Sequence, residues 1–205
     1  MKQRHFIDSH KGVTGLAILG MMALHEQWNN PTAWVYLALH GTYGILWVVK
    51  SRVFGDSQWE QSTTAGYALV IWGGLSLYWI APWILTAGDV HAPLWMLCLC
   101  TCMYTFGVFL HFASDMQKHT TLALRKGLMT EGLWSRCRNP NYLGELLIYL
   151  GFGLLPMHWL PLAVLGLFVA AVWVPNMLRK DRSLSRYPEF EAYRQRSKLL
   201  IPFVV

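Results

Sequence analysis

The residues with the clearest chemical potential lie in one short run, Arg138-Asn139-Pro140-Asn141-Tyr142-Leu143-Gly144-Glu145. Proline suits the first turn of a helix, so a helix is predicted to begin here. The free N–H groups of that turn and the positive end of the helix dipole favour an anion beside Arg138. Asn141 adds an amide that can donate and accept, as recognition of a carboxamide requires. Glu145 follows one turn later, at the predicted membrane edge, where an ionised carboxylate needs a partner.

Two further segments carry groups that suit an anionic ligand. Asp115 and Lys118 follow directly from an apolar stretch and share one face of a continuing helix, where a solvated ion pair is the plainer interpretation. In the basic and aromatic tail after residue 178, Tyr187, Phe190 and Tyr193 recur at three-residue spacing, which predicts one face of a helix. We expect this tail either to contact anionic lipid or to form a lid over a cofactor, with the apolar residues 199–205 returning to the helices.

The first half of the chain offers His40 and Tyr43, three residues apart within an apolar stretch. This spacing places them on one face of a helix, where they could line a cavity and polarise a substrate carbonyl. Polar residues in such stretches are more often satisfied inside a helical bundle, so both interpretations stay open.

The composition decides where these residues must be placed. Of the 205 residues, 54% are hydrophobic and 14% are charged, whereas soluble domains average roughly 25% charged residues. So few charges hardly cover a water-soluble surface, and disorder, a coiled coil and a disulfide scaffold are excluded on the same grounds. The sequence therefore predicts an integral membrane protein of the all-α class, in contact with membrane lipid.

A bilayer requires about 20 mostly apolar helical residues per crossing. Six stretches approach this length, and the first and fifth are short for a full span. They are Gly12–Leu24, Ala33–Val49, Gly66–Leu85, Pro93–Phe112, Leu143–Leu155 and Trp159–Leu178.

The basic residues indicate an orientation for these six helices. All 17 lie before the first stretch, after the second, between the fourth and fifth, or after the sixth. Positive residues are retained on the cytoplasmic side, so both termini are predicted to be cytoplasmic, and a bacterial inner membrane is expected. This placement also explains the net charge of +6 without a nucleic-acid partner. The sequence does not indicate an oligomeric state.

The polar motifs concentrate in the second half of the chain. We therefore expect residues 1–110 to form the substrate side and residues 111–205 to form a cofactor-binding half. Cys98, Cys100 and Cys102 alternate along a helix and do not face one site, so neither a disulfide nor a metal site is predicted.

The motifs of residues 105–205 carry a resemblance to a known family. Asp115–Lys118, Gly132-Leu133-Trp134, Arg138–Glu145 and the closing Tyr193–Phe203 resemble the C-terminal domain of the steroid 5α-reductases, most closely a bacterial branch of that family. The wider superfamily includes sterol reductases and the isoprenylcysteine and phospholipid methyltransferases. The resemblance implies a helical membrane bundle with a cytoplasm-facing pocket for NADPH.

The resemblance also implies roles for individual residues. Asn141 and Glu145 would contact the nicotinamide end, Asp115 the ribose or a phosphate, and Tyr193 the adenosine part. Lys118 and Tyr142 lie in the same matching segments. The phosphates would be met by basic residues, which suit them chemically: Arg125, Arg138, Arg182, Arg196 and Lys198.

Departures from the family pattern limit what is carried over. The Gln-Glu-Leu-Pro motif that helps 5α-reductases polarise a steroid carbonyl is absent, which makes a steroid substrate doubtful. The methyltransferases carry Arg-His-Pro and an acidic pair where this chain has Arg138-Asn139-Pro140 and Arg179-Lys180-Asp181-Arg182.

We therefore expect an NADPH-dependent reductase of an activated C=C bond in a lipophilic small molecule, with Glu145 and either Tyr43 or His40 as catalytic candidates. The alternatives are a methyltransferase that uses S-adenosylmethionine and a non-catalytic lipid-binding membrane protein.

Overall fold

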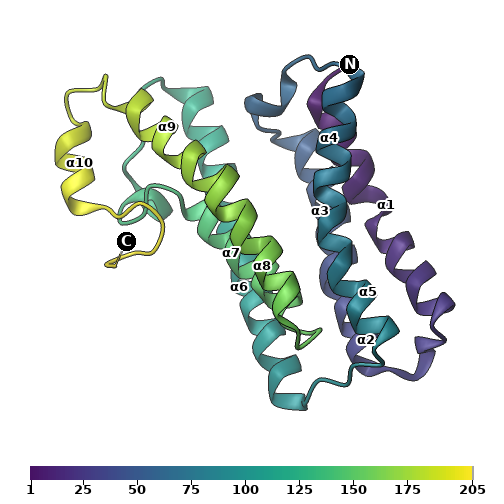
Figure 1. The fold of residues 1–205 in the computed structure, drawn as a ribbon. Coiled ribbons are helices and arrows are strands. Elements are labelled where there is room, and N and C mark those ends of the chain that lie inside the picture. Colours follow the sequence, from purple (N-terminus) through teal and green to yellow (C-terminus); the bar gives the residue numbers. More distant parts are fainter. Residues whose placement is uncertain (205) are drawn as a thin grey trace. The chain divides into compact units, whose positions relative to one another are not determined.

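The structure, a computed structural model, describes residues 1–204 and is helical (Figure 1). Within these residues, β-structure is limited to two isolated bridges, Lys2 with Ser62 and Cys137 with Lys198. Four helical stretches are long and apolar enough to cross a membrane, which supports the prediction of an α-helical integral membrane protein. They are Pro31–Val53, Ala65–Ala87, Leu94–Leu124 and Trp159–Leu184.

The helices agree in place with all six predicted stretches, although two of them do not meet the same criteria of length and composition. They are α1 (Gln3–Leu24), α2 (Pro31–Tyr36), α3 (Thr42–Val53), α4 (Ala65–Ser76), α5 (Ile80–Ala87), α6 (Leu94–Leu124), α7 (Pro140–Gly153), α8 (Trp159–Phe168), α9 (Val174–Leu184) and α10 (Phe190–Arg196). The first and fifth predicted spans correspond to α1 and to α7, which has 14 residues.

Short irregular turns join several of these helices into longer stretches. The π-helical segments η2 (Leu37–Gly41) and η6 (Val169–Trp173) connect α2 to α3 and α8 to α9. The 3₁₀ turn η4 (Leu77–Trp79) connects α4 to α5. Such π-helical turns occur frequently at functional sites, and His40 lies in one of them.

The chain divides into two compact units. Unit 1 comprises Met1–Tyr104 and Leu150–Leu165, and unit 2 comprises Thr105–Tyr149 and the residues from Gly166 onward. Helices α6 and α7 therefore each contribute to both units. The assignment of substrate and cofactor roles to residues 1–110 and 111–205 stays a prediction.

Glycine allows the helices of unit 1 to approach closely. Helices α1, α3 and α4 run side by side (Figure 1). A Cβ atom added to Gly44 would lie 2.1 Å from the backbone oxygen of Lys11, and one added to Gly41 would lie 3.3 Å from the Cα of Gly15. The helix α1 can therefore pack against α3 at this distance because these positions lack side chains.

Close approach of helices at glycine also positions the polar motif in unit 2. A Cβ atom added to Gly144 would lie 2.4 Å from the backbone nitrogen of His111, and one added to Gly107 would lie 2.6 Å from the backbone oxygen of Gly144. This contact sets α7 directly against α6. Because α6 continues to Leu124, Asp115 and Lys118 lie on the same helix, as predicted.

Candidate functional site

The first turn of α7 holds the side-chain amide of Asn141. The helix begins at Pro140, as predicted, and the backbone oxygen of Asn141 accepts a hydrogen bond from Nδ1 of His111 at 3.0 Å. The side-chain Oδ1 of Asn141 is buried, and residues 1–204 offer it no hydrogen-bond partner. Leaving such an acceptor unsatisfied costs about 1–3 kcal/mol. A ligand that donates a hydrogen bond here would remove that cost.

Arg138 connects the segment before α7 to two distant parts of unit 2. Its side chain is 8% exposed and forms an ion pair with Asp181 on α9, at 3.0 Å between Nε and Oδ2. Its Nη1 donates to the backbone oxygen of Ser197 at 2.6 Å. The guanidinium group therefore holds α9 and the segment after α10 to the start of α7.

Lys180 and Asn139 form a second connection beside the first. The Nζ of Lys180 donates to the backbone oxygen of Arg138 at 2.6 Å and to Oδ1 of Asn139 at 2.8 Å. The Nδ2 of Asn139 donates to the backbone oxygen of Leu199 at 2.9 Å. Asn139 is fully buried, and both its Nδ2 and its Oδ1 form hydrogen bonds within the protein. Both polar residues before Pro140 therefore hold unit 2 together.

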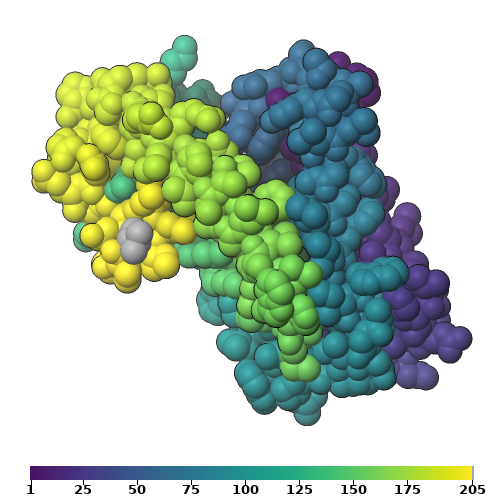
Figure 2. All heavy atoms as spheres, in the orientation of Figure 1, coloured from purple at the N-terminus to yellow at the C-terminus, as the bar shows by residue number. Residues whose placement is uncertain are grey.

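The residues directly after α10 pair with the segment before α7, as predicted for the start of the apolar tail, whereas Ile201, Phe203 and Val204 are exposed and Val205 lies outside the described residues. The backbone nitrogens of Lys198 and Arg138 donate to the backbone oxygens of Arg136 and Lys198, at 3.0 and 2.8 Å. The Sγ of Cys137 donates to the backbone oxygen of Leu200 at 3.0 Å. Burial raises the pKa of the Cys137 thiol, which keeps it protonated and able to donate. Figure 2 shows the atoms of α9, α10 and this tail gathered at one end of unit 2.

Aromatic side chains complete this end of unit 2. The hydroxyl of Tyr193 donates to the backbone oxygen of Trp134 at 2.6 Å, and the indole Nε1 of Trp134 donates to the backbone oxygen of Ser114 at 3.2 Å. Burial raises the pKa of Tyr193 to about 12, so its hydroxyl stays protonated. Phe190 and Tyr193 lie on α10 and are both buried, in agreement with the predicted helix face, but Tyr187 lies in the turn between α9 and α10, so the prediction was wrong for that residue.

These contacts surround a cavity of about 390 Å³, which we call the unit 2 cavity. Its volume falls within the range of about 300–1,000 Å³ that is typical of small-molecule sites. Five basic residues line it, together with three aromatic side chains and several apolar ones. The lining residues are Lys118, Leu122, Lys126, Gly127, Leu128, Met129, Trp134, Arg138, Lys180, Leu184, Arg186, Tyr187 and Tyr193. The combination suits a ligand with anionic groups and a flat ring.

Three of the predicted cofactor residues, Lys118, Arg138 and Tyr193, line the unit 2 cavity. Four others lie on α6 and α7 of the same unit, outside the set that lines it. Asp115 is buried, Asn141 and Glu145 are half-buried, and the half-buried ring of Tyr142 packs 5.5 Å from Trp173.

The remaining predicted basic residues are exposed and lie outside the set that lines the cavity. Arg125 forms an ion pair with Glu131, and the guanidinium of Arg196 lies 5.8 Å from the ring centroid of Tyr193. Arg182 is on α9, and the backbone of Lys198 forms the bridge with Cys137. The structure therefore does not bring the five predicted phosphate-binding residues together.

The two catalytic candidates of the first half are buried inside unit 1. The ring of His40 stacks on Phe152, with centroids 4.1 Å apart, and its Nδ1 lies 2.9 Å from the hydroxyl of Tyr36. Tyr43 is fully buried, and the Nζ of Lys11 lies 4.5 Å from the centroid of its ring. His40 and Tyr43 therefore pack against different neighbours.

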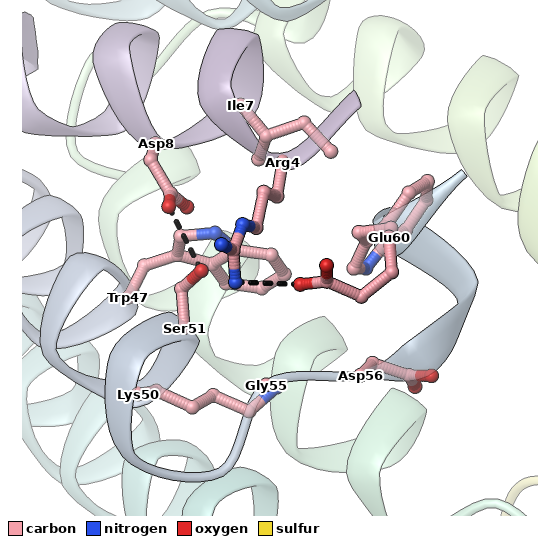
Figure 3. A pocket seen from close by; sticks show the side chains of 10 residues that line it. Arg4, Ile7, Asp8, Trp47, Lys50, Ser51, Gly55, Asp56 and Glu60 are labelled. Carbon is pink, nitrogen blue, oxygen red and sulfur yellow. Dashed lines mark hydrogen bonds and ion pairs between the residues drawn. The ribbon is translucent and has the colours of Figure 1, made fainter. Parts of the chain in front are cut away.

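A second, much smaller cavity lies in unit 1 between α1, α3 and the segment that follows α3 (Figure 3). It encloses about 10 Å³, which is about the space that one water molecule needs. Ser51 donates to Asp8 at 2.8 Å, and Arg4 pairs with Glu60 at 2.6 Å. These contacts engage Arg4, Ser51 and Oδ2 of Asp8 within unit 1, whereas the buried Oδ1 of Asp8 has no hydrogen-bond partner among residues 1–204. In residues 1–204 no group of three or more His, Cys, Asp or Glu side chains forms a potential metal site.

Sequence reasoning missed several residues that line the unit 2 cavity, above all Lys180. The structure shows that the last apolar helix continues past Leu178 to Leu184. Lys180 and Leu184 are four positions apart, a spacing that places them on one helix face and could have been read from the sequence. Lys126 and Arg186 carry no comparable signal.

Comparison with known proteins identifies a relative and a family for this chain. The "Cobalt-zinc-cadmium resistance protein CzcN" of Cupriavidus metallidurans is 28% identical over 160 residues, which cover 77% of this chain. The chain spans 60% of the length of that relative. Residues 56–198 match the family described as "Protein of unknown function (DUF1295)". The match covers more than half of the chain and includes the start of α7 and the unit 2 cavity. The chain therefore belongs to the DUF1295 family, within the steroid 5α-reductase-like superfamily.

Proposed function

We propose that this protein is a membrane-embedded, NADPH-dependent reductase that acts on an activated C=C bond of a lipophilic substrate. The observation that carries the proposal is the unit 2 cavity, lined by five basic residues in the unit whose α7 begins with the unpartnered amide oxygen of Asn141. Membership of a family in the 5α-reductase-like superfamily supports the same activity.

The residues present fit the chemical parts of this coenzyme. Lysine and arginine side chains suit its phosphates, and the faces of Trp134, Tyr187 and Tyr193 suit its adenine ring. The amide oxygen of Asn141 can accept a hydrogen bond from the nicotinamide carboxamide, since it lacks a partner within residues 1–204. A carboxamide also has an oxygen that accepts, which the Asn141 NH₂ group can satisfy.

The side chains of the protein would then bind and orient the coenzyme and exclude water from it. Asn141 and Glu145, one turn apart on α7, orient the nicotinamide end, while Lys118 and Lys180 hold phosphate. The coenzyme, when bound, supplies a hydride for the β-carbon of a conjugated carbonyl compound. His40 and Tyr43, the sequence candidates for polarising that carbonyl, are buried inside unit 1 and line neither of the two cavities described above.

We further propose six membrane crossings with both termini in the cytoplasm of a bacterial cell. In addition to the four long apolar stretches, α1 and α7 would cross as shorter helices. The distribution of the 17 basic residues supports this orientation. Reporter fusions after residues 28, 90 and 157 should report the periplasm, and one after residue 198 should report the cytoplasm.

Ligand-dependent unfolding of the detergent-purified chain tests the activity class. A ligand that binds the folded state alone stabilises it by about 2.7 kcal/mol at one hundred times its Kd. We expect NADPH to raise the unfolding midpoint more than NADH does, and S-adenosylmethionine to raise it least of the three. Stabilisation by S-adenosylmethionine without stabilisation by NADPH would instead indicate a methyltransferase. No effect of any of the three would favour a non-catalytic lipid-binding protein.

Two variants locate the effect. Asn141→Ala and Glu145→Ala should each remove most of the shift caused by NADPH. Asn176→Ala is the matched control, because Asn176 lies on α9, where its Oδ1 accepts a hydrogen bond from Arg179. It should retain the full shift.

A further inference from the structure

Lys180 is held in one place by its contacts. Two of its hydrogen bonds go to neutral oxygens, the backbone oxygen of Arg138 and Oδ1 of Asn139, at 2.6 and 2.8 Å. Its Nζ also lies 4.4 Å from the ring centroid of Trp134. An ammonium group has three N–H donors, so these two bonds leave one donor and the positive charge for a ligand. Because the acceptors belong to the segment before α7, the ammonium is positioned before any ligand arrives.

The two cations at this point of the cavity differ in how their charge is used. Arg138 pairs with Asp181 at 3.0 Å and donates to Ser197. Its charge and part of its hydrogen-bond donors are therefore already engaged within the protein. The hydrogen bonds of Lys180 go to neutral oxygens and leave its charge without such a direct offset. Burial and the positive charge of Lys118 disfavour this charge, whereas the carboxylates of Asp181 and Asp115 favour it, as an anionic ligand would. Lys118 adds a second positive charge nearby.

The surroundings amplify the effect of this charge. The described residues that line the cavity include no acidic side chain, and Trp134, Leu184 and Tyr193 make its walls partly apolar. Charge interactions are stronger beside apolar walls than in bulk water. A cationic group placed beside Lys180 would be repelled, and an anionic group would be attracted and hydrogen-bonded.

We propose that Lys180 is a specificity-determining residue that binds an anionic group of the ligand in the unit 2 cavity and disfavours a ligand that is cationic at this point. The inference rests on the proposed function and deepens it: with NADPH the anionic group is a phosphate, and the sulfonium of S-adenosylmethionine is the cation that is rejected.

The test compares the affinities of Lys180→Met, Lys180→Arg and unaltered protein for NADPH and for S-adenosylmethionine, measured by ligand-dependent unfolding. Lys180→Met should weaken NADPH binding by about tenfold or more, because a hydrogen bond to a charged group is lost. It should leave S-adenosylmethionine binding unchanged or improved. Lys180→Arg keeps the charge and should recover part of the preference for NADPH.

Arg179→Met is the matched control, since Arg179 is an exposed neighbour on the same helix and the same charge is removed. It should change neither affinity by more than about twofold. A purely structural role of Lys180 would lower both affinities together and leave their ratio unchanged, and that result would overturn the proposal.

The outcomes separate this inference from the proposed function. If NADPH binds unaltered protein and Lys180→Met equally well, the inference fails and the reductase proposal stands. If NADPH does not bind but inorganic pyrophosphate binds and requires Lys180, the reductase proposal fails and the inference stands. If S-adenosylmethionine binds unaltered protein more tightly than NADPH does, both fail.

A measurement on unaltered protein covers the case in which the variants do not fold. Acetylation of lysines with a water-soluble reagent, followed by mass spectrometry, should show Lys180 protected by NADPH, while Lys2 is modified equally with and without it. Equal modification of Lys180 in both samples, at NADPH concentrations that stabilise the protein, would refute the assignment.

Discussion

The two compact units use their buried polar side chains in different ways. In unit 1 several of them lie against aromatic rings: the Nζ of Lys50 lies 4.8 Å from the centroid of Trp47, and His40 stacks on Phe152, although Asn30 donates to the backbone oxygen of Val90, 60 positions later. In unit 2 they bind backbone segments far away in the sequence, as Arg138 binds Ser197 and Asn139 binds Leu199. The cavities described above differ accordingly, at about 10 Å³ in unit 1 and about 390 Å³ in unit 2.

This difference indicates where a ligand belongs. The hydrogen bonds of unit 2 join the segments that surround its cavity, and such bonds can hold the walls of an opening in position. The predictions that follow test this contrast, in order of decreasing expected effect.

Removal of the Arg138 side chain should have the largest effect. Arg138→Met leaves Asp181, 15% exposed, without its ion-pair partner, and breaking a buried pair costs about 3–5 kcal/mol. Denaturant unfolding should show this loss, and proteolysis should cut the tail after α10 more readily. The control is Lys2→Met, which removes an exposed ion pair of unit 1 with Glu60 and should cost at most about 1 kcal/mol. Equal losses in the two variants would contradict the contrast between the units.

Close helix approach at glycine should matter in both units. Gly44→Ala and Gly144→Ala each place a Cβ within 2.5 Å of backbone atoms, and overpacking of this kind costs about 1–3 kcal/mol. Gly73→Ala and Gly166→Ala are matched controls, because nothing lies within 4 Å of the added Cβ. Both controls should be neutral or stabilise by up to about 1 kcal/mol. Thermal unfolding distinguishes the two pairs, and an unaffected Gly144→Ala would disprove the α6–α7 contact.

Loss of the Tyr193 hydroxyl should have a moderate effect confined to unit 2. Tyr193→Phe removes the hydrogen bond to Trp134 and should cost about 0.5–1.5 kcal/mol. Because burial raises the pKa of Tyr193 above its ordinary value of 10.0 to about 12, the stability that it contributes is full below pH 10 and is lost as the pH rises toward 12. The variant should lack this alkaline loss in unfolding measured from pH 9 to 12. Tyr67→Phe, at an exposed tyrosine of α4, should behave like unaltered protein.

The smallest effect is expected at the surface of unit 1. The hydrogen bond from Lys2, and next the charge of Arg4, lower the pKa of Glu60 below its ordinary value of 4.5. Its contribution to stability is therefore full above pH 4.5 and is lost as the pH falls through the lowered pKa. Glu60→Gln should flatten the acid limb of the unfolding midpoint between pH 6 and 3, and Lys2→Met should do so in part. An unchanged acid limb in Glu60→Gln would show that these ion pairs contribute nothing measurable.

The sequence predicted the elements of the site better than their connections. The helix start at Pro140, the shared helix of Asp115 and Lys118, and the buried face of Phe190 and Tyr193 all follow from local signals, and the structure contains each of them. Pro, apolar spacing and helix continuation act over a few residues, which is why a single sequence reveals them.

The partners of the polar residues could not be predicted in the same way. Arg138 was expected to meet phosphate, but its ion pair joins it to Asp181, 43 positions later. Lys180 received no role, because its contacts with Arg138 and Asn139 arise when α9 packs beside the start of α7. Gly144 was one letter of a motif, and the structure shows that it permits α7 to approach His111.

The sequence alone determined that this chain builds apolar helices of membrane-spanning length and gathers its polar motifs in the second half. Those properties depend on composition and on short-range spacing, which no tertiary contact can change. The tertiary structure decided which cations are used to hold the fold and which line the unit 2 cavity. That distinction depends on which backbone oxygens and carboxylates come within hydrogen-bond distance, and side chains 40 to 60 residues apart acquire such neighbours only when the helices pack.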